Sequence, residues 1–301
     1  MKKILVPLDG SLHSEEVLPY VKMLALPSGA EVILLRVVPF LWPEEYVQVR
    51  EISRKMDKEA SDYLFVLQTH LEEKGIRANL LVHEGNVPEV ICDTAREGGA
   101  DLIVFSTHGH GGLKRWTLGS VADKVIQAST VPLLIYRNTP EPVTNPCCRN
   151  ILVPVDGSVF SEYIFPQVRL MVKLFNAKVW FLSVVNTPSL IHGFSLQEED
   201  MNAIGDKVTE TVKHYCTSLE NRLQKDSPAN YEMVVRKGDP AEVICDFAQK
   251  NSIDIIAMSS HGRTGLCRWA LGSVADKVIR LSSKPVLLAR VSKEQGKPST
   301  K

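Results

Sequence analysis

The sequence lacks an excess of either charge, because its 301 residues include 35 Lys and Arg and 35 Asp and Glu. A balanced chain produces no overall field that would draw it to nucleic acid or to an anionic membrane surface. It also lacks any apolar run near the roughly 18 residues that a membrane span needs. Pro7, Asp9 and Gly10 interrupt the apolar stretch after Met-Lys-Lys, which indicates a first strand rather than a signal peptide. We therefore expect a cytoplasmic protein without membrane or nucleic-acid partners.

The sequence has no Cys-x-x-Cys pair among its six cysteines. Cys92 and Cys245 occupy matching places in two predicted helices, where a thiol is usually a small apolar group. Cys147 and Cys148 lie in a stretch that also contains prolines. This spacing favours reduced structural thiols over a zinc or redox role.

What the sequence does contain is an internal repeat. The segment ILVPLDGS at 4–11 recurs as ILVPVDGS at 151–158, and LGSVADKVI at 118–126 recurs unchanged at 271–279. Each copy has about 150 residues, which is the size of a domain rather than of a solenoid unit. The predicted organisation is a first domain at 1–138, a linker at 139–149, a second domain at 150–291 and a flexible tail at 292–301.

Short apolar, β-branched segments alternate with helical patterns in both copies, which predicts an α/β fold. Because these segments suit strands buried on both faces, we expect each domain to be a doubly wound, five-stranded parallel sheet flanked by helices. The predicted strands are 3–8, 31–38, 76–83, 101–106 and 131–136, and in the second copy 150–155, 178–185, 231–236, 254–258 and 285–289. Asn86, with Glu89 three residues later, resembles a capping box at the start of a helix.

An aspartate follows the first strand of each copy, as Asp9 after Pro7 and Asp156 after Pro154. In an open parallel sheet, ligands bind beyond the carboxyl ends of the strands. The prolines loosen the strand end because they donate no ladder hydrogen bond. The carboxylates can accept hydrogen bonds from sugar hydroxyls or an exocyclic amine. The alternative is that Asp-Gly-Ser is turn chemistry that caps the next helix, and the repeat favours neither interpretation.

A glycine loop follows the fourth strand of each copy. It runs from Ser106 and Gly109 over nine residues to Gly119-Ser120-Val121, and from Ser259 and Gly262 over nine residues to Gly272-Ser273-Val274. Glycine lacks a Cβ, so a phosphate can approach its backbone, and the start of the following helix attracts anions. The alternative is a glycine turn with an ordinary serine N-cap. The same glycine interval in both copies favours phosphate contact.

These features resemble the universal stress protein family. The segment SSHGRTGLCRWALGSVADKVI at 259–279 is similar to the signature of that family, and the similarity covers both repeats. The resemblance implies a tandem universal stress protein of the adenine nucleotide alpha hydrolase-like fold. It also implies that the repeats pack as a pseudo-two-fold pair through their last strands, with a homodimer as a further option. The apolar segments 131–136 and 285–290 suit such pairing, because an edge strand of that kind invites a partner.

The resemblance further implies an adenine nucleotide, ATP foremost, with or without Mg²⁺, in one or both repeats. The binding residues that it implies are Asp9, Val37, Ser106, Gly109, Gly119, Ser120 and Val121 in the first repeat, and Asp156, Val184, Ser259, Gly262, Gly272, Ser273 and Val274 in the second. The residues themselves add Pro7, Pro154 and Arg263 to this candidate set. Arg263 belongs to this set because a guanidinium binds phosphate as a forked donor. The sequence departs from the family pattern at Ser106 and Ser259, where a glycine near the ribose is replaced.

Three functions are compatible with these residues. The first is a stress-response protein that binds ATP as a regulatory or signalling module and acts through a protein partner. The second is a slow ATPase, since phosphoryl transfer needs mainly positioning and charge neutralisation. The third is a nucleotide-free scaffold whose sites are closed by Ser106 and Ser259. His108 and His261 match between the copies without a repeated nucleophile beside them, which indicates a loop-bracing role and favours a binding module over an enzyme.

Overall fold

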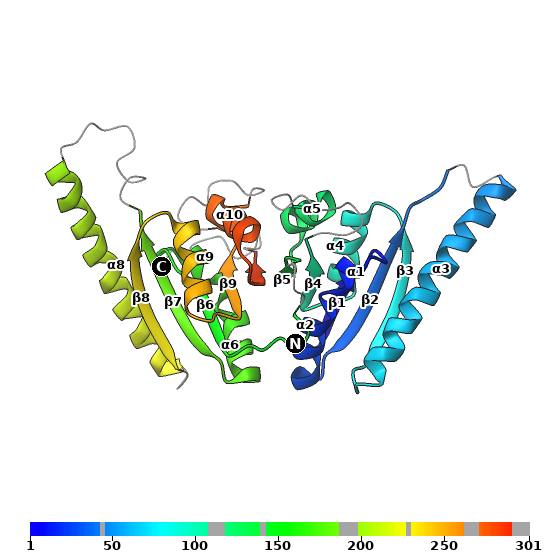
Figure 1. The fold of residues 1–301 in the computed structure, drawn as a ribbon, viewed down its shortest axis with the longest axis horizontal. Coiled ribbons are helices and arrows are strands. Elements are labelled where there is room, and N and C mark those ends of the chain that lie inside the picture. The colour runs from blue at the N-terminus through cyan, green and yellow to red at the C-terminus, as the bar shows by residue number, and fades with distance from the viewer. Residues whose placement is uncertain are drawn as a thin grey trace, which may run out of the picture. The chain divides into compact units, whose positions relative to one another are not determined.

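A computed structural model describes residues 1–42, 46–107, 118–138, 143–186, 198–226, 230–261 and 271–290 of the chain. The chain divides into two compact units, Met1–Cys147 and Cys148–Lys301. Both contain the same succession of strands and helices (Figure 1). Throughout the described ranges, no helix combines the length and the apolar character that crossing a bilayer requires.

The first unit is a parallel sheet with the strand order β3-β2-β1-β4-β5. Its strands are β1 (Lys3–Pro7), β2 (Glu31–Val38), β3 (Ala78–Glu84), β4 (Leu102–Ser106) and β5 (Leu133–Tyr136). Its helices are α1 (Leu12–Glu15), α2 (Leu18–Ser28), α3 (Val47–Glu72), α4 (Val87–Glu97) and α5 (Ser120–Ala128). Helix α3 lies along β2 and β3, whereas α4 packs against α5.

The second unit repeats this sheet with the order β10-β9-β6-β7-β8, again with parallel pairs. Its strands are β6 (Asn150–Pro154), β7 (Lys178–Val185), β8 (Tyr231–Lys237), β9 (Ile255–Ser259) and β10 (Val286–Ala289). A 3-10 turn, η1 (Val159–Ile164), precedes α6 (Phe165–Phe175), and the other helices are α8 (Glu198–Asp226), α9 (Pro240–Lys250) and α10 (Ser273–Leu281). Helices α9 and α10 pack together, as α4 and α5 do.

The central strands are buried because helices cover both faces of each sheet. Ile4, Leu5 and Val6 of β1 are fully buried, as are Leu152 and Val153 of β6. In each unit the chain winds from the first strand to the third and then returns to the other side of the first strand. The winding therefore reverses between β1 and β4 and between β6 and β9, where ligands bind in open α/β sheets. The predicted fold class, two tandem doubly wound α/β domains, is confirmed.

One local prediction is wrong. Helix α4 begins after Asn86, but the Asn86 side chain makes no capping hydrogen bond. The matching helix α9 begins after Asp239, whose Oδ1 accepts the N–H groups of Ala241 at 3.0 Å and Glu242 at 3.2 Å. The two repeats thus start the same helix in two different ways.

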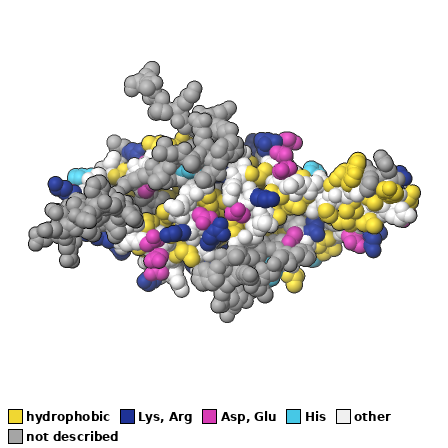
Figure 2. Space-filling view, turned by 90° about the horizontal axis from the view of Figure 1, so that it is seen from above, with side chains coloured by type: hydrophobic (Ala, Val, Ile, Leu, Met, Phe, Trp, Pro, Cys, Tyr) yellow, Lys and Arg dark blue, Asp and Glu magenta, His cyan; other side chains and the backbone are white. Residues whose placement is uncertain are grey.

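The surface mixes both signs of charge. On the face drawn in Figure 2, basic and acidic side chains are interspersed. Exposed apolar side chains occur around the start of α3, where Phe40 and Trp42 stack with ring centroids 6.4 Å apart.

Candidate functional site

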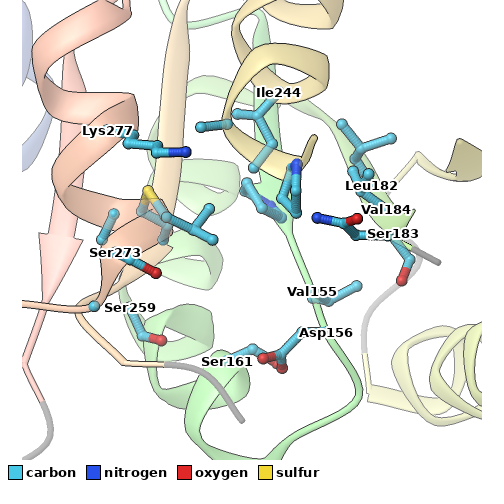
Figure 3. Close-up of a pocket in the computed structure, with 18 of the residues that line it drawn as sticks. Val155, Asp156, Ser161, Leu182, Ser183, Val184, Ile244, Ser259, Ser273 and Lys277 are labelled. Atoms are coloured by element: carbon cyan, nitrogen blue, oxygen red, sulfur yellow. The ribbon is translucent and has the colours of Figure 1, made fainter. Parts of the chain in front are cut away.

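The second unit contains a cavity of about 520 Å³ at the carboxyl edge of its sheet (Figure 3). The ends of β6, β7 and β9 and the starts of α9 and α10 form its wall. The predicted residues that line it are Pro154, Asp156, Val184, Ser259, Gly272, Ser273 and Val274. Two more predicted residues of this repeat, Gly262 and Arg263, lie outside the described residues. The structure therefore gathers around one cavity the side chains that the sequence places on four separate elements.

Asp156 lines this cavity and follows the end of β6. Its Oδ1 accepts hydrogen bonds from the N–H of Ser158 at 2.9 Å and from the Ser158 hydroxyl at 2.6 Å. Ser158, not the aspartate, caps η1 by accepting the N–H of Ser161 at 3.2 Å. Asp156 thus orients the capping serine and also lines the cavity, while its contact with a ligand stays a prediction.

The first repeat builds the same turn. Asp9 Oδ1 accepts the Ser11 N–H at 3.0 Å and the Ser11 hydroxyl at 2.5 Å. Ser11 in turn caps α1 by accepting the N–H of Ser14 at 3.1 Å. Pro7 and Pro154 end β1 and β6 in the same register, beside Leu35 and Leu182. This device is therefore a common property of both repeats.

Gly272 lines the cavity at the start of α10, and the structure shows a packing reason for a glycine at this position. A Cβ added there would lie 2.9 Å from the carbonyl oxygen of Ser260, which already accepts the Gly272 N–H at 2.8 Å. Gly119 stands in the same relation to Thr107 O, also at 2.9 Å. The missing Cβ thus lets the helix start pack against the exit of the preceding strand, and the predicted phosphate contact stays a prediction. Gly109 and Gly262 lie outside the described residues.

The start of α10 offers donors to the cavity. Gly272 is the N-cap, so Ser273 is the first helical residue, and no side chain caps this helix. The first intrahelical bond is donated by Asp276 N–H to Gly272 O, so the N–H groups of Ser273 and Val274 precede the hydrogen-bonded ladder. Such N–H groups and the helix dipole form an anion site. In α5 the serine is again the first helical residue, so the serine N-cap alternative is wrong for Ser120 and for Ser273.

Ser259 ends β9 in the cavity wall and is 6% exposed. Its hydroxyl donates to the carbonyl oxygen of His261 at 2.7 Å. The neighbouring Ser260 hydroxyl is bonded to His261 Nδ1 at 2.9 Å. The hydroxyl that replaces the family glycine is therefore turned into its own loop, and His261 braces that loop as predicted. His108 lies outside the described residues.

The cavity wall also contains two charged residues, Asp239 and Lys277, that were not predicted from the sequence. Lys277 Nζ lies 3.4 Å from Asp239 Oδ2, and Figure 3 shows the Lys277 side chain extending toward the cavity. Desolvation raises the pKa of Asp239, but the N–H of Glu242 and the Lys277 ammonium outweigh it, so this pKa lies below its ordinary value. The signal in the sequence was Asp-Pro before a helix, a common N-cap pattern.

The first repeat differs at the position of Ser183, which lines the second-repeat cavity and is 2% exposed. The matching residue on β2 is Arg36, because β1 pairs with β2 in the register in which β6 pairs with β7. Arg36 Nη1 donates to Leu8 O at 3.3 Å and lies 3.4 Å from the place of a Cβ on Gly10. The Arg36 side chain thus lies across Leu8, just after the end of β1. The residue that matches Leu8 in the second repeat is Val155, which lines the second-repeat cavity. The sequence analysis missed Arg36 as well.

The remaining predicted residues of the first repeat share the carboxyl edge of their sheet. Pro7 and Asp9 lie at the end of β1, Val37 near the end of β2 and Ser106 at the end of β4. Gly119, Ser120 and Val121 start α5, next to the exit of β4. Their arrangement repeats that of the second-repeat residues, apart from the arginine that lies among them.

Comparison with known proteins agrees with the fold of the two repeats. A universal stress protein of Methanocaldococcus jannaschii is 31% identical over 154 residues, which cover 47% of this chain and 94% of that protein. One of Bacillus subtilis is 34% identical over 148 residues, covering 45% of this chain and 98% of that protein. The solved structure of a universal stress protein from Archaeoglobus fulgidus is 21% identical, covers 96% of this chain and 98% of its own, and has a TM-score of 0.74. This likeness shows that the whole tandem fold recurs.

The family model described as the universal stress protein family matches residues 1–137 and 148–290. The two matched segments contain both copies of the aspartate turn and both helix starts. Since the matches together span most of the sequence, the chain belongs to the universal stress protein family.

Proposed function

We propose that this chain is a stress-response protein that binds an adenine nucleotide, ATP foremost, as a regulatory or signalling module, with the second repeat as a binding site. The observation that carries the proposal is the cavity, in which a carboxylate, a strand end and an anion-attracting helix start face one space. Ligand sites typically combine mostly apolar walls with a few convergent polar groups. The second-repeat cavity has this composition.

Each part of a nucleotide has a suitable counterpart in the wall. Ile244, Ala241 and Met258 supply apolar surface for a base, beside the Val184 main chain at the end of β7. Asp156 is placed to accept hydrogen bonds from ribose hydroxyls. The N–H groups of Ser273 and Val274 suit a phosphate, since they precede the α10 ladder. In this proposal, any Mg²⁺ is bound by the phosphate groups of the nucleotide.

The Ser259 geometry favours this proposal over the nucleotide-free scaffold. A scaffold in which this serine closes the site needs its Cβ and hydroxyl to crowd the ligand space, whereas the cavity beside Ser259 is open. The hydroxyl donates instead to His261 O, within its own loop. The slow ATPase remains the other alternative, and its test is phosphate release above the uncatalysed rate that is lost in Asp156→Ala.

Isothermal titration of the full chain with ATP and Mg²⁺ tests the proposal. We expect saturable heat that Asp156→Ala weakens, because that change removes the ribose acceptor from the cavity wall. Native mass spectrometry of the purified chain adds a direct reading, since a bound adenine nucleotide would appear as an added mass. Absence of heat with ATP, ADP and AMP would contradict the proposal.

The proposal also includes the cellular location of the protein and its partners. We place it in the cytoplasm, with a protein partner that reads the nucleotide state, and cell fractionation followed by immunodetection checks the location. The pairing of the repeats through their last strands and the homodimer stay predictions. Analytical ultracentrifugation of the full chain distinguishes a monomer from a homodimer.

A further inference from the structure

The ion pair between Lys277 and Asp239 lies in the wall of the nucleotide cavity, next to the start of α10. Both carboxylate oxygens of Asp239 are in use. Oδ1 accepts the N–H groups of Ala241 and Glu242, and Oδ2 accepts the Lys277 ammonium at 3.4 Å. The one lysine of the described cavity wall is therefore held by a carboxylate that belongs to the same wall.

The first repeat has a different residue at the position of Asp239. Lys124 occupies the position of Lys277 within the shared segment LGSVADKVI, and Asn86 occupies the position of Asp239 as the residue before the matching helix. An asparagine carries no charge and forms no ion pair with the lysine. The lysine is thus kept in both repeats, whereas the carboxylate that holds it is present in the second repeat alone.

We propose that Asp239 is a specificity residue that lowers the preference of the second repeat for ATP relative to AMP. The inference rests on the proposed nucleotide function. Asp239 acts in two ways: it keeps the Lys277 ammonium from a phosphate chain, and it adds a negative charge to the wall that faces that chain. Both effects grow with the charge of the ligand, so they oppose ATP more than AMP.

A purely structural role for Asp239 makes a different prediction. As the N-cap of α9 it contributes to helix stability, but asparagine caps a helix about as well as aspartate. Helix α4 also forms in the first repeat without a side-chain cap from Asn86. Asp239→Asn therefore removes the charge and leaves the helix start in place.

Asp246→Asn is the matched control. Asp246 lies on the same helix, and its Oδ2 is also 3.4 Å from a lysine, Lys250, but this pair is exposed and does not belong to the cavity wall. The control removes one negative charge from α9 at a distance from the ligand space. It separates the local effect of Asp239 from a change in the overall field of the protein.

The experiment is isothermal titration of the full chain with ATP and with AMP, without divalent ions, for the wild type, Asp239→Asn and Asp246→Asn. We expect Asp239→Asn to raise the ATP affinity of the second repeat about three- to ten-fold, with a smaller change for AMP, and Asp246→Asn to change neither by more than about two-fold. The reciprocal Asn86→Asp is expected to lower the ATP-to-AMP affinity ratio of the first repeat.

The outcomes separate this inference from the proposed function. If the wild type binds both nucleotides but their affinity ratio is the same in Asp239→Asn, the inference is overturned and the proposed function stands. A weaker ATP affinity in Asp239→Asn, or an equal gain in Asp246→Asn, overturns the inference as well. If the wild type binds neither nucleotide, both fail.

Discussion

The two repeats of this chain share their backbone devices and differ in the charged side chains at their sites. Both use Asp-Gly-Ser to orient a capping serine, and both need a glycine where the helix start meets a carbonyl oxygen. By contrast, the first repeat has Arg36 at the position of Ser183 in the second repeat, and Asn86 at the position of Asp239. The difference teaches that duplication has kept the geometry of the site while its charge and its free space have changed.

The charge difference has a direction. At the matched positions, the first repeat has Arg36 and Asn86 where the second has Ser183 and Asp239, while the lysine is the same in both. The first repeat is therefore more positive than the second at these positions. Arg36 also lies across the end of β1, where the second repeat has open space beside the small Ser183. The two sites are thus expected to differ in the ligand that they hold.

The largest effect is expected from Gly272→Val, which disrupts the close contact between the helix start and a carbonyl oxygen that both repeats share. Its Cβ would lie 2.9 Å from Ser260 O, a backbone atom that cannot move aside cheaply. We expect a loss of about 1–3 kcal/mol in the free energy of unfolding and the loss of nucleotide binding to the second repeat. Urea denaturation and isothermal titration measure the two effects. Gly119→Val should cost a similar amount, and a cost near zero for either would contradict the packing argument.

Exchanging Arg36 and its counterpart Ser183 tests whether the space beside these side chains decides nucleotide binding. Ser183→Arg places a long cation in the cavity wall, so we expect the nucleotide affinity of the second repeat to fall about ten-fold or more, which corresponds to about 1.4 kcal/mol. Arg36→Ser should open the first repeat and raise its affinity. Titration calorimetry reports both, with Ser183→Ala as the control that keeps the space open. If Ser183→Arg binds as the wild type does, the cavity is not the binding site.

A smaller difference is expected at two half-buried tyrosines, Tyr63 and Tyr215. Tyr63 donates to Glu15 Oε1 at 3.0 Å, and Tyr215 donates to Glu162 Oε1 at 3.0 Å, but Glu162 also pairs with Arg222 at 2.6 Å. Burial, together with the neighbouring glutamate, raises the pKa of both tyrosines above the ordinary value.

We therefore expect Tyr63→Phe to lower the free energy of unfolding by about 1 kcal/mol and Tyr215→Phe by less, because Glu162 keeps a partner. Urea denaturation of the two variants measures the difference. An equal loss in both would show that Arg222 does not compensate for the missing hydroxyl.

The smallest effect concerns acid stability. Because the pKa of Asp239 is lowered in the folded chain, its contribution is present above the unfolded pKa and is lost as the pH falls through the folded one. We expect Asp239→Asn to remove a few tenths of a kcal/mol of stability near pH 7 and to change nothing well below about pH 4, since the group is near the surface and screened. Thermal unfolding at several pH values checks this, and a loss that persists in acid would point to the cap instead of the charge.

Much of the fold could be predicted from local patterns. The apolar, β-branched strands and the intervening helices follow from periodicity, and the repeat itself divides the chain. The position of Asp9 and Asp156 at the carboxyl edge also follows, since each comes directly after a strand. The Asn86 capping box could not be judged from the pattern, because a cap depends on where one side chain turns. The packing reason for the glycine at Gly272 could not be predicted, since its contact with Ser260 O joins residues twelve positions apart.

By itself, the amino-acid sequence determined the duplication, the fold class, the family and the elements on which the site residues lie, because these depend on patterns within short segments. Only the tertiary structure decided which side chains share a space. Arg36 reaches Leu8 from the neighbouring strand, and Lys277 meets Asp239 across two helices. Such contacts arise from strand register and helix packing over long sequence separations. For that reason, the likeness of the two repeats was visible in the sequence, whereas the difference between their sites was not.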